Sequence, residues 1–329
     1  MTQDREKILV IRLGALGDIC LSLGPMAAIR RHHPRAEIVL LTSPVFAEWL
    51  KNCPYFVRIE AVPRHSRYSP RGLWRVGRWL RRESFTRIYD LQTSAHSRSY
   101  FYLLPRGPSR PEWSGHVAAA SHSDLGNPNR ETSHTVDRQR EQLRIAGIGS
   151  VPLADFDWMP DSDWRRFGIT EPFAVLVIGA SARPFGKKWP AANFAALAVR
   201  LQLELGLTVV LVGGAGEVSL AAEIAAAAKV VNLTGKTDLS DLVTLAKQGR
   251  ILVGNDTGPA HLMAIAGIPS LMLFSQATHP WKAAPKGKNG HYIQVEAGMG
   301  LDQLSVEEVF TKITAILNNR LGQSAGATR

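Results

Sequence analysis

The fold is decided by the stretch "ILVIRLGALGDICLSLGPMAAIRRHHPRAEIVLLT", residues 8–42. Its two apolar runs, at 8–13 and 37–42, are typical of buried strands, and the segment near 19–33 between them is predicted to be a helix. A strand, a helix and a second strand in succession predict a parallel sheet with helices on its faces. We therefore expect an α/β fold.

The same alternation continues along the chain in two blocks. The first block adds expected strands at 57–62 and 87–92 and expected helices near 70–82 and 135–146. The second block has expected strands at 173–179, 207–214, 229–235, 250–256 and 270–275, and expected helices near 190–204, 216–228, 238–248, 259–267 and 305–318. This repetition predicts two domains, each built on a doubly wound parallel sheet.

A segment without clear periodicity separates the two blocks. Residues 151–171 mix prolines, acids and tryptophans, which predicts a linker. We expect one domain at 1–160 and another at 161–329. The last helix could pack on either block, and the Gly/Ala/Ser tail, at about 322–329, is expected to be disordered.

The composition is that of an ordinary globular protein and excludes several classes. Of 329 residues, 45% are hydrophobic and 20% are charged, and the two cysteines without a CxxC pair predict neither a disulfide framework nor a zinc site. The polar N-terminus and its short apolar run predict neither a signal peptide nor a membrane span, so we expect a cytoplasmic protein. A net charge of +11 indicates an anionic partner: nucleic acid, a phosphorylated glycan or an acidic membrane face.

Two glycines and an aspartate form the first strand-to-helix turn, "LGALGDIC" at 13–20. Neither this loop nor "GGAGE" at 213–217 has the G-x-G-x-x-G spacing of a dinucleotide loop, which argues against nicotinamide binding. The glycines allow the backbone to approach a ligand closely. Asp18 falls where the helix begins, so it either caps that helix or carries chemistry.

A second loop, "GNDTGPAH" at 254–261, follows an expected strand. The proline in the first turn of the next helix leaves backbone N–H groups near Gly258 free to bind a diphosphate. Asp256 and Thr257 could bind sugar hydroxyls, and His261 could reach the same ligand. The alternative interpretation is a plain helix cap with a core histidine.

A third loop, "GASARPFGKKWP" at 179–190, also follows an expected strand. Ser181 can offer a hydroxyl to a phosphate, and either Lys187 or Lys188 can offer a cation. The Trp-Pro pair at the end of the loop opens the next helix. One lysine of the pair could simply be solvated.

A strongly basic segment lies at 64–87, with eight arginines against one glutamate. Helical spacing places arginines on one face and apolar residues on the opposite face. The arginines are Arg71, Arg75, Arg78 and Arg82, and the apolar residues are Leu73, Val76 and Leu80. Such a helix is either a solvated surface helix or, because its arginines repel one another, the contact for an anionic partner.

Taken together, the opening stretch, "GASARPFGKKWP" and "GNDTGPAHLMAIAGIPSLMLF" at 254–274 resemble glycosyltransferase family 9, the lipopolysaccharide heptosyltransferases. The order and spacing of these motifs cover nearly the whole chain. The resemblance implies the GT-B fold, in which two Rossmann-like parallel-sheet α/β domains face each other across a central crevice. The N-terminal domain would bind the acceptor and the C-terminal domain the nucleotide sugar.

The resemblance also implies a role for each matched residue. Asp18 matches the position proposed as catalytic base in the family, Glu217 would contact the ribose and Thr237 the base of the nucleotide. The residues expected to bind the donor are Ser181, Lys187, Lys188, Glu217, Thr237, Asp256, Thr257, Gly258 and His261. The residues expected to bind the acceptor are Gly17, Arg64, Arg67, Arg71, Arg75 and Arg78.

The activity implied by the resemblance is inverting transfer of heptose, or a related sugar, from an ADP-linked donor to a lipopolysaccharide inner-core acceptor, without metal or other cofactor. The enzyme would act as a monomer at the cytoplasmic face of the inner membrane, with no nucleic-acid partner. The D-x-D strings at 155–157 and 161–163 are expected to be linker or cap residues and not a metal site.

Two other hypotheses stay open at this stage. The segment "SQATHPWKAAP" at 275–285 departs from the family pattern, so the chain could use another nucleotide sugar or another glycan acceptor. Alternatively, the chain could be a basic nucleic-acid-binding protein, although the arginine segment is not accompanied by an RRM, KH or zinc-finger pattern.

Overall fold

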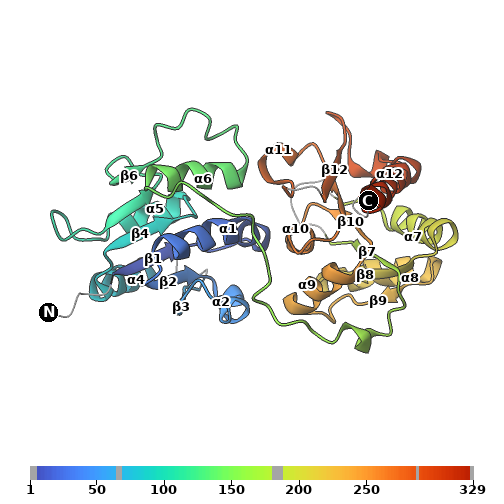
Figure 1. The fold of residues 1–329 in the computed structure, drawn as a ribbon, viewed down its shortest axis with the longest axis horizontal. Helices are drawn as coiled ribbons and strands as arrows, with labels where there is room; N and C mark the ends of the chain where they lie inside the picture. The colour runs from blue at the N-terminus through green and yellow to red at the C-terminus, as the bar shows by residue number, and fades with distance from the viewer. Residues whose placement is uncertain (1–5, 64–68, 180–187, 287–288, 327–329) are drawn as a thin grey trace. The chain divides into compact units, whose positions relative to one another are not determined.

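The computed structural model describes residues 6–63, 69–179, 188–286 and 289–326, with the side chains of the last helix described up to Arg320. The chain divides into two compact units, Met1–Met159 and Pro160–Arg329. In both units helices flank a central sheet (Figure 1).

The N-terminal unit is built on a six-stranded parallel sheet with the strand order β3-β2-β1-β4-β5-β6. The strands are β1 Lys7–Ile11, β2 Glu37–Thr42, β3 Arg58–Ala61, β4 Arg87–Asp90, β5 Glu112–Gly115 and β6 His122–Ser123. The helices are α1 Leu16–His32, α2 Pro44–Leu50, α4 Pro70–Glu83, α5 Ala95–Phe101 and α6 Thr135–Ile145. The four expected strands are confirmed, whereas β5, β6, α2 and α5 were not predicted.

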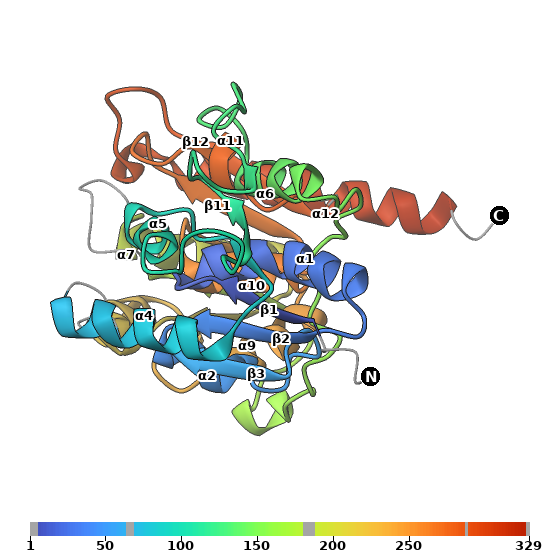
Figure 2. The same cartoon turned by 90° about the vertical axis from the view of Figure 1, so that its left-hand side faces the viewer.

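The basic helix α4 confirms the predicted amphipathic pattern. Ser69 accepts a hydrogen bond from the backbone N–H of Gly72 at 3.0 Å, and Pro70 fills the first turn, so the helix begins where a cap and a proline favour it. Val76 and Leu80 are buried in the apolar core that α4 and α5 form with the strands. Figure 2 shows α4 along one side of this unit. The arginines of its opposite face are exposed.

The C-terminal unit contains a second six-stranded parallel sheet, with the order β12-β11-β10-β7-β8-β9. The strands are β7 Phe173–Val177, β8 Thr208–Val212, β9 Val231–Asn232, β10 Ile251–Asn255, β11 Ser270–Phe274 and β12 Gly290–Gln294. The helices are α7 Ala191–Leu205, α8 Val218–Ala227, α9 Leu239–Gln248, α10 Gly258–Ile265, α11 Pro280–Ala283 and α12 Val306–Gly326. The five expected strands are confirmed, and β12 was not predicted.

The position and length of the last helix, α12, concern two expectations: where it packs and whether the tail is ordered. Helix α12 packs in the C-terminal unit, where Val309 and Ile313 share a buried core with Phe194 of α7. Helix α12 continues as far as Gly326, which includes part of the tail at about 322–329 that was expected to be disordered.

Both sheets have the strand order of a Rossmann fold, 3-2-1-4-5-6, when the strands of each unit are numbered in sequence. The order reverses between β1 and β4 in the first unit and between β7 and β10 in the second. Ligands of open parallel sheets bind at the carboxyl edge beside such a reversal. The expected doubly wound α/β class is confirmed, and the two reversals mark where the functional loops should be sought.

No helix in the described part of the chain is both long and apolar enough to cross a membrane.

A buried carboxylate organises the turn that follows β4. Asp90 is fully buried, and its Oδ1 accepts hydrogen bonds from the backbone N–H groups of Gln92 and Thr93, at 3.1 and 3.0 Å. Its Oδ2 accepts a hydrogen bond from the Ser97 hydroxyl at 2.9 Å. Burial raises the pKa of Asp90 to about 6, although these hydrogen bonds and Arg12 act in the opposite direction.

Asp90→Asn should therefore remove a pH dependence of stability. The folded state binds the Asp90 proton more tightly than the unfolded state, so the carboxylate reduces stability progressively as pH rises from about 4 to about 6, and by a constant amount above that. Between about pH 4 and pH 6, we expect the free energy of unfolding of the variant to rise by roughly 2 to 3 kcal/mol relative to that of the wild type. Thermal unfolding between pH 4 and 8 measures this difference, and a difference that stays constant with pH would contradict the prediction.

Candidate functional site

Asp18 lies at the carboxyl edge of the N-terminal sheet, in the first turn of α1. Its Oδ2 accepts a hydrogen bond from the Ala15 backbone N–H at 3.2 Å, and its Oδ1 forms an ion pair with Arg12 Nη2 at 3.1 Å. The side chain is nonetheless 46% exposed. Asp18 does cap its helix, and its carboxylate is also open to a substrate.

Arg12 holds the Asp18 carboxylate in place from the buried side. The residue is buried, and its Nε donates to the Asp18 carbonyl at 3.3 Å while its Nη1 donates to the Leu91 carbonyl at 2.7 Å. Burial lowers the pKa of Arg12, and the charges of Asp18 and Asp90 counteract that shift. The side chain thus joins the loops after β1 and β4 across the reversal of the strand order. Sequence analysis missed this role, although a charged residue inside an apolar strand was a signal for it.

A pocket of about 840 Å³ opens at the same edge. Its lining comes from the loops after β1, β2 and β4 and includes Gly14, Ser43, Gln92 and His96. Gly14 has a φ of +131°, and a Cβ there would lie 2.9 Å from a Phe46 side-chain atom, so this turn favours glycine. The volume suits a small ligand such as one or two sugar rings.

The expected acceptor residues that the structure describes lie on two different helices of the N-terminal unit. Gly17 is buried beside Asp18 in the first turn of α1. Arg71, Arg75 and Arg78 lie on the exposed face of α4, which is a different helix from the one that carries Asp18. Arg64 and Arg67 lie outside the described residues.

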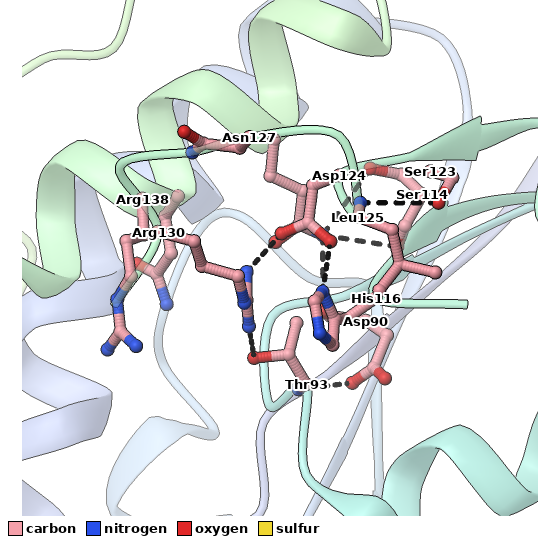
Figure 3. Close-up of polar contacts among 12 residues, drawn as sticks. Asp90, Thr93, Ser114, His116, Ser123, Asp124, Leu125, Asn127, Arg130 and Arg138 are labelled. Atoms are coloured by element: carbon pink, nitrogen blue, oxygen red, sulfur yellow. Dashed lines mark hydrogen bonds and ion pairs between the residues drawn. The ribbon is translucent and has the colours of Figure 1, made fainter. Parts of the chain in front are cut away.

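A polar network that sequence analysis did not predict lies at the carboxyl ends of β4, β5 and β6 (Figure 3). Asp124 is buried between His116 and Arg130, and Arg130 Nη2 donates to the Thr93 hydroxyl at 2.8 Å. Arg138 lies beside Arg130. Burial lowers the pKa of Arg138, and the nearby positive charge of Arg130 lowers it further. His116 and Asp124 follow β5 and β6, two strands that sequence analysis did not predict.

In the C-terminal unit, the loop after β10 leads into α10, which begins at Gly258 with a proline in its first turn. His261 Nε2 lies 2.8 Å from Asp256 Oδ1, and both side chains are largely buried. Within the described part of the chain, the buried atoms Thr257 Oγ1 and His261 Nδ1 have no hydrogen-bond partner. Buried polar atoms are usually paired, so these two atoms and the N–H groups of α10 are available to a ligand.

Asn255 joins this loop to the loop after β7. Its Oδ1 accepts a hydrogen bond from the Trp189 backbone N–H at 3.1 Å, and its Nδ2 donates to the carbonyls of Ile178 and Gly179 at 3.2 and 3.1 Å. Trp189 is fully buried, and Lys188 before it is exposed. Lys188 is thus anchored at the edge where phosphate binding was predicted. Ser181 and Lys187 lie outside the described residues.

The remaining predicted donor residues follow β8 and β9 at the same edge. Glu217 Oε2 accepts a hydrogen bond from the Gly214 backbone N–H at 2.8 Å, and the carboxyl carbon lies 3.4 Å from where a Cβ on Gly179 would stand. Thr237 is half-buried and precedes Asp238, the N-cap of α9. Four loops of one sheet edge therefore carry the predicted donor residues that the structure describes.

Acidic residues form no metal-binding group in the described parts of the chain, where no three His, Cys, Asp or Glu side chains are arranged to hold an ion. Acids of the two D-x-D strings make structural contacts. Asp155 accepts a hydrogen bond from the Asp157 backbone N–H at 3.4 Å, and Asp161 forms an ion pair with Lys247 at 2.8 Å.

Comparison with known proteins identifies the family to which the chain belongs. A family model described as glycosyltransferase family 9 (heptosyltransferase) matches residues 73–303. Lipooligosaccharide heptosyltransferase 2 of Haemophilus ducreyi is 23% identical over 318 residues, which is 89% of each chain. Lipopolysaccharide heptosyltransferase 2 of Salmonella typhimurium is 26% identical over 297 residues, which is 83% of each chain.

Solved structures share the fold over nearly the whole chain. A glycosyl transferase family 9 protein from Veillonella parvula matches with a TM-score of 0.76 at 21% identity, covering 97% of this chain and 99% of that one. The Escherichia coli ADP-heptose lipopolysaccharide heptosyltransferase II matches with a TM-score of 0.74 at 22% identity, covering 95% and 99%. Since the family model spans well over half of the sequence, the chain belongs to glycosyltransferase family 9, the heptosyltransferases, and is a glycosyltransferase.

Proposed function

We propose that this enzyme transfers heptose from an ADP-linked donor to a lipopolysaccharide inner-core acceptor, with inversion and without a metal ion. The observation that carries the proposal is the pair of sheet edges. One holds the exposed and anchored carboxylate of Asp18, and the other holds the polar atoms Thr257 Oγ1 and His261 Nδ1, unpaired within the described residues, beside the start of α10. The names of the relatives from H. ducreyi and S. typhimurium support the choice of sugar and acceptor.

In the proposed reaction Asp18 is the general base. The acceptor hydroxyl oxygen attacks the anomeric carbon of the donor, Asp18 takes the hydroxyl proton, and the bond from the anomeric carbon to the diphosphate oxygen breaks. The bonding electron pair leaves with the nucleoside diphosphate. Attack opposite the leaving group inverts the anomeric configuration. Arg12 keeps the carboxylate oriented toward its substrate during proton transfer.

The C-terminal unit would bind the donor and stabilise the leaving diphosphate. The first N–H groups of α10 point out of the helix start, and anions bind there because of the helix dipole. Lys188, or Lys187 beside it in sequence, would add a positive charge, and Glu217 and Thr237 would contact the nucleoside. Fixed donors of this kind stabilise developing negative charge without a metal.

The exposed arginine face of α4 would bring the enzyme to the anionic cytoplasmic face of the inner membrane. Trp74 is 56% exposed on this helix, and the guanidinium carbon of Arg78 lies 4.5 Å from the centre of its ring. An exposed tryptophan among arginines is typical of helices that lie at a lipid interface. Five exposed arginines on one helix also suit a phosphorylated glycolipid acceptor.

Asp18→Asn should abolish most of the turnover and leave donor binding intact. Loss of a general base lowers kcat by about 10² to 10⁴-fold, while the donor residues belong to the other unit. Steady-state kinetics with ADP-heptose, together with ADP binding by calorimetry, separate the two effects. Asp155→Asn is the matched control, because it makes the same change in a D-x-D string and should retain wild-type kcat. Near-normal turnover of the Asp18 variant would refute the role as base.

Donor identity is tested by thermal shift against ADP-, UDP- and GDP-sugars. We expect ADP-heptose to raise the melting temperature most, since a ligand that binds only the folded state stabilises it by about 2.7 kcal/mol at a hundredfold excess over its Kd. A larger shift with a UDP- or GDP-sugar would refute the ADP-heptose donor. Binding to DNA or RNA with a steep salt dependence, and no shift with any nucleotide sugar, would favour the nucleic-acid hypothesis instead.

Neutralising two arginines of α4 should weaken membrane binding. Each basic residue near an anionic surface contributes about 1 kcal/mol, so Arg71→Gln combined with Arg75→Gln should lower the affinity for phosphatidylglycerol vesicles about thirtyfold. Arg31→Gln combined with Arg35→Gln is the matched control, because these exposed arginines lie at the C-terminal end of α1, the end far from Asp18. Vesicle sedimentation measures both pairs, and equal losses would contradict a specific role for α4.

A further inference from the structure

The network around Asp124 lies on the same sheet edge as Asp18 but has no part in the proposed chemistry. His116 directly follows β5, Thr93 follows β4 and Asp18 follows β1. Since β4 separates β1 from β5 and neighbouring strands are about 4.8 Å apart, the ends of β1 and β5 are roughly 10 Å apart along this edge. Thr93 lies on the intervening stretch, after β4, and its hydroxyl accepts a hydrogen bond of 2.8 Å from Arg130 Nη2.

Asp124 fixes the imidazole of His116 in one tautomer. Its Oδ1 lies 2.9 Å from His116 Nδ1, while its Oδ2 forms an ion pair with the Arg130 guanidinium (Figure 3). An ionised carboxylate can only accept hydrogen bonds, so Nδ1 carries the proton. In the neutral ring Nε2 is then a hydrogen-bond acceptor.

The imidazole that carries this acceptor atom is partly exposed. The His116 side chain is 20% exposed, whereas Asp124 is only 1% exposed. Among the residues that the structure describes, none forms a hydrogen bond with His116 Nε2. The histidine therefore has one nitrogen, Nδ1, that is held by Asp124, and one acceptor nitrogen, Nε2, that no described residue uses.

The support for this imidazole is energetically costly, which argues against an incidental contact. Asp124 and Arg130 are both removed from water, and burying an ion pair carries a large desolvation penalty. Thr93, which accepts a hydrogen bond from Arg130, has a φ of +46°, a strained conformation for a β-branched residue. Such strain is typical of residues held in place for a function.

We propose that His116 binds a hydroxyl group of the acceptor sugar through Nε2, and that Asp124 and Arg130 are positioning residues for its ring. A sugar hydroxyl is the ligand that fits, because it donates a hydrogen bond to a neutral acceptor and carries no charge. The Arg138 guanidinium, beside Arg130, would offer donors to the oxygens of the same glycan. The inference rests on the proposed function and extends the acceptor site from Asp18 along the edge to β5.

The test is calorimetric binding of a deacylated core oligosaccharide, prepared from a heptose-deficient strain, to the full chain without donor. His116→Ala should raise the Kd about tenfold through the loss of one hydrogen bond, and His116→Gln should recover most of the affinity. The matched control is His122→Ala, because His122 is 23% exposed and lies 3.4 Å from an acidic partner, Glu112, but belongs to β6. It should bind like the wild type.

Asp124→Asn tests the positioning role. It should weaken oligosaccharide binding as much as His116→Ala, and the double variant should lose no more than either single variant, because both changes remove one interaction. The partly exposed His116 variants keep the test informative if Asp124→Asn fails to fold. Unchanged binding by His116→Ala, an equal loss in the control, or no binding by the wild type would overturn the inference. Binding through His116 without heptose transfer would instead refute the proposed reaction and leave this inference standing.

Discussion

The ion pair between buried Arg12 and half-exposed Asp18 is the interaction on which the N-terminal site depends. Arg12 directly follows the first strand and donates a hydrogen bond to the carbonyl of Leu91 after β4, so one guanidinium joins the two loops that flank the reversal of strand order. Gln139 of α6 reinforces this junction with hydrogen bonds to Ser22 and to the same Leu91 carbonyl. A buried cation needs such partners, because an unpaired one would be strongly destabilising. The exposed carboxylate is thereby held rigidly although it lies at the surface.

The two units have the same strand order, but the side chains that hold their functional loops together differ in charge. In the C-terminal unit the bracing is neutral: the Asn255 amide joins two loops and leaves backbone N–H groups and a lysine facing outward. This edge suits a diphosphate, whose charge those groups can stabilise. In the N-terminal unit the bracing is ionic and presents a carboxylate and a histidine, which suit hydroxyl groups. Under the proposed function, the same strand order would support an anion site in one unit and a polyol site in the other.

The central strands, all of which sequence analysis predicted, have long apolar runs, and the three strands that it missed are short or polar. β1 and β7 are buried on both faces and read as continuous hydrophobic segments, which is typical of parallel sheets. β5, β6 and β12 contain glycine, histidine or glutamate and have no such run. They become strands because a neighbouring strand offers its hydrogen-bonding edge, a contribution that local propensity does not include. The His116 network was missed for the same reason, since it depends on the ends of β5 and β6.

By itself the sequence determined the α/β class, the strand–loop–helix motifs and the residues within them, such as Asp18 and the Asp256–His261 pair. These motifs can be located from the sequence because a strand end, a glycine turn and a helix start are adjacent in the chain, so their geometry is local. Only the tertiary structure decided which distant side chains complete the site. Arg12 reaches Leu91, and Asp124 joins His116 to Arg130, because pairing of β1, β4, β5 and β6 brings their carboxyl ends to one edge. Those partners are set by strand order, which no local pattern encodes.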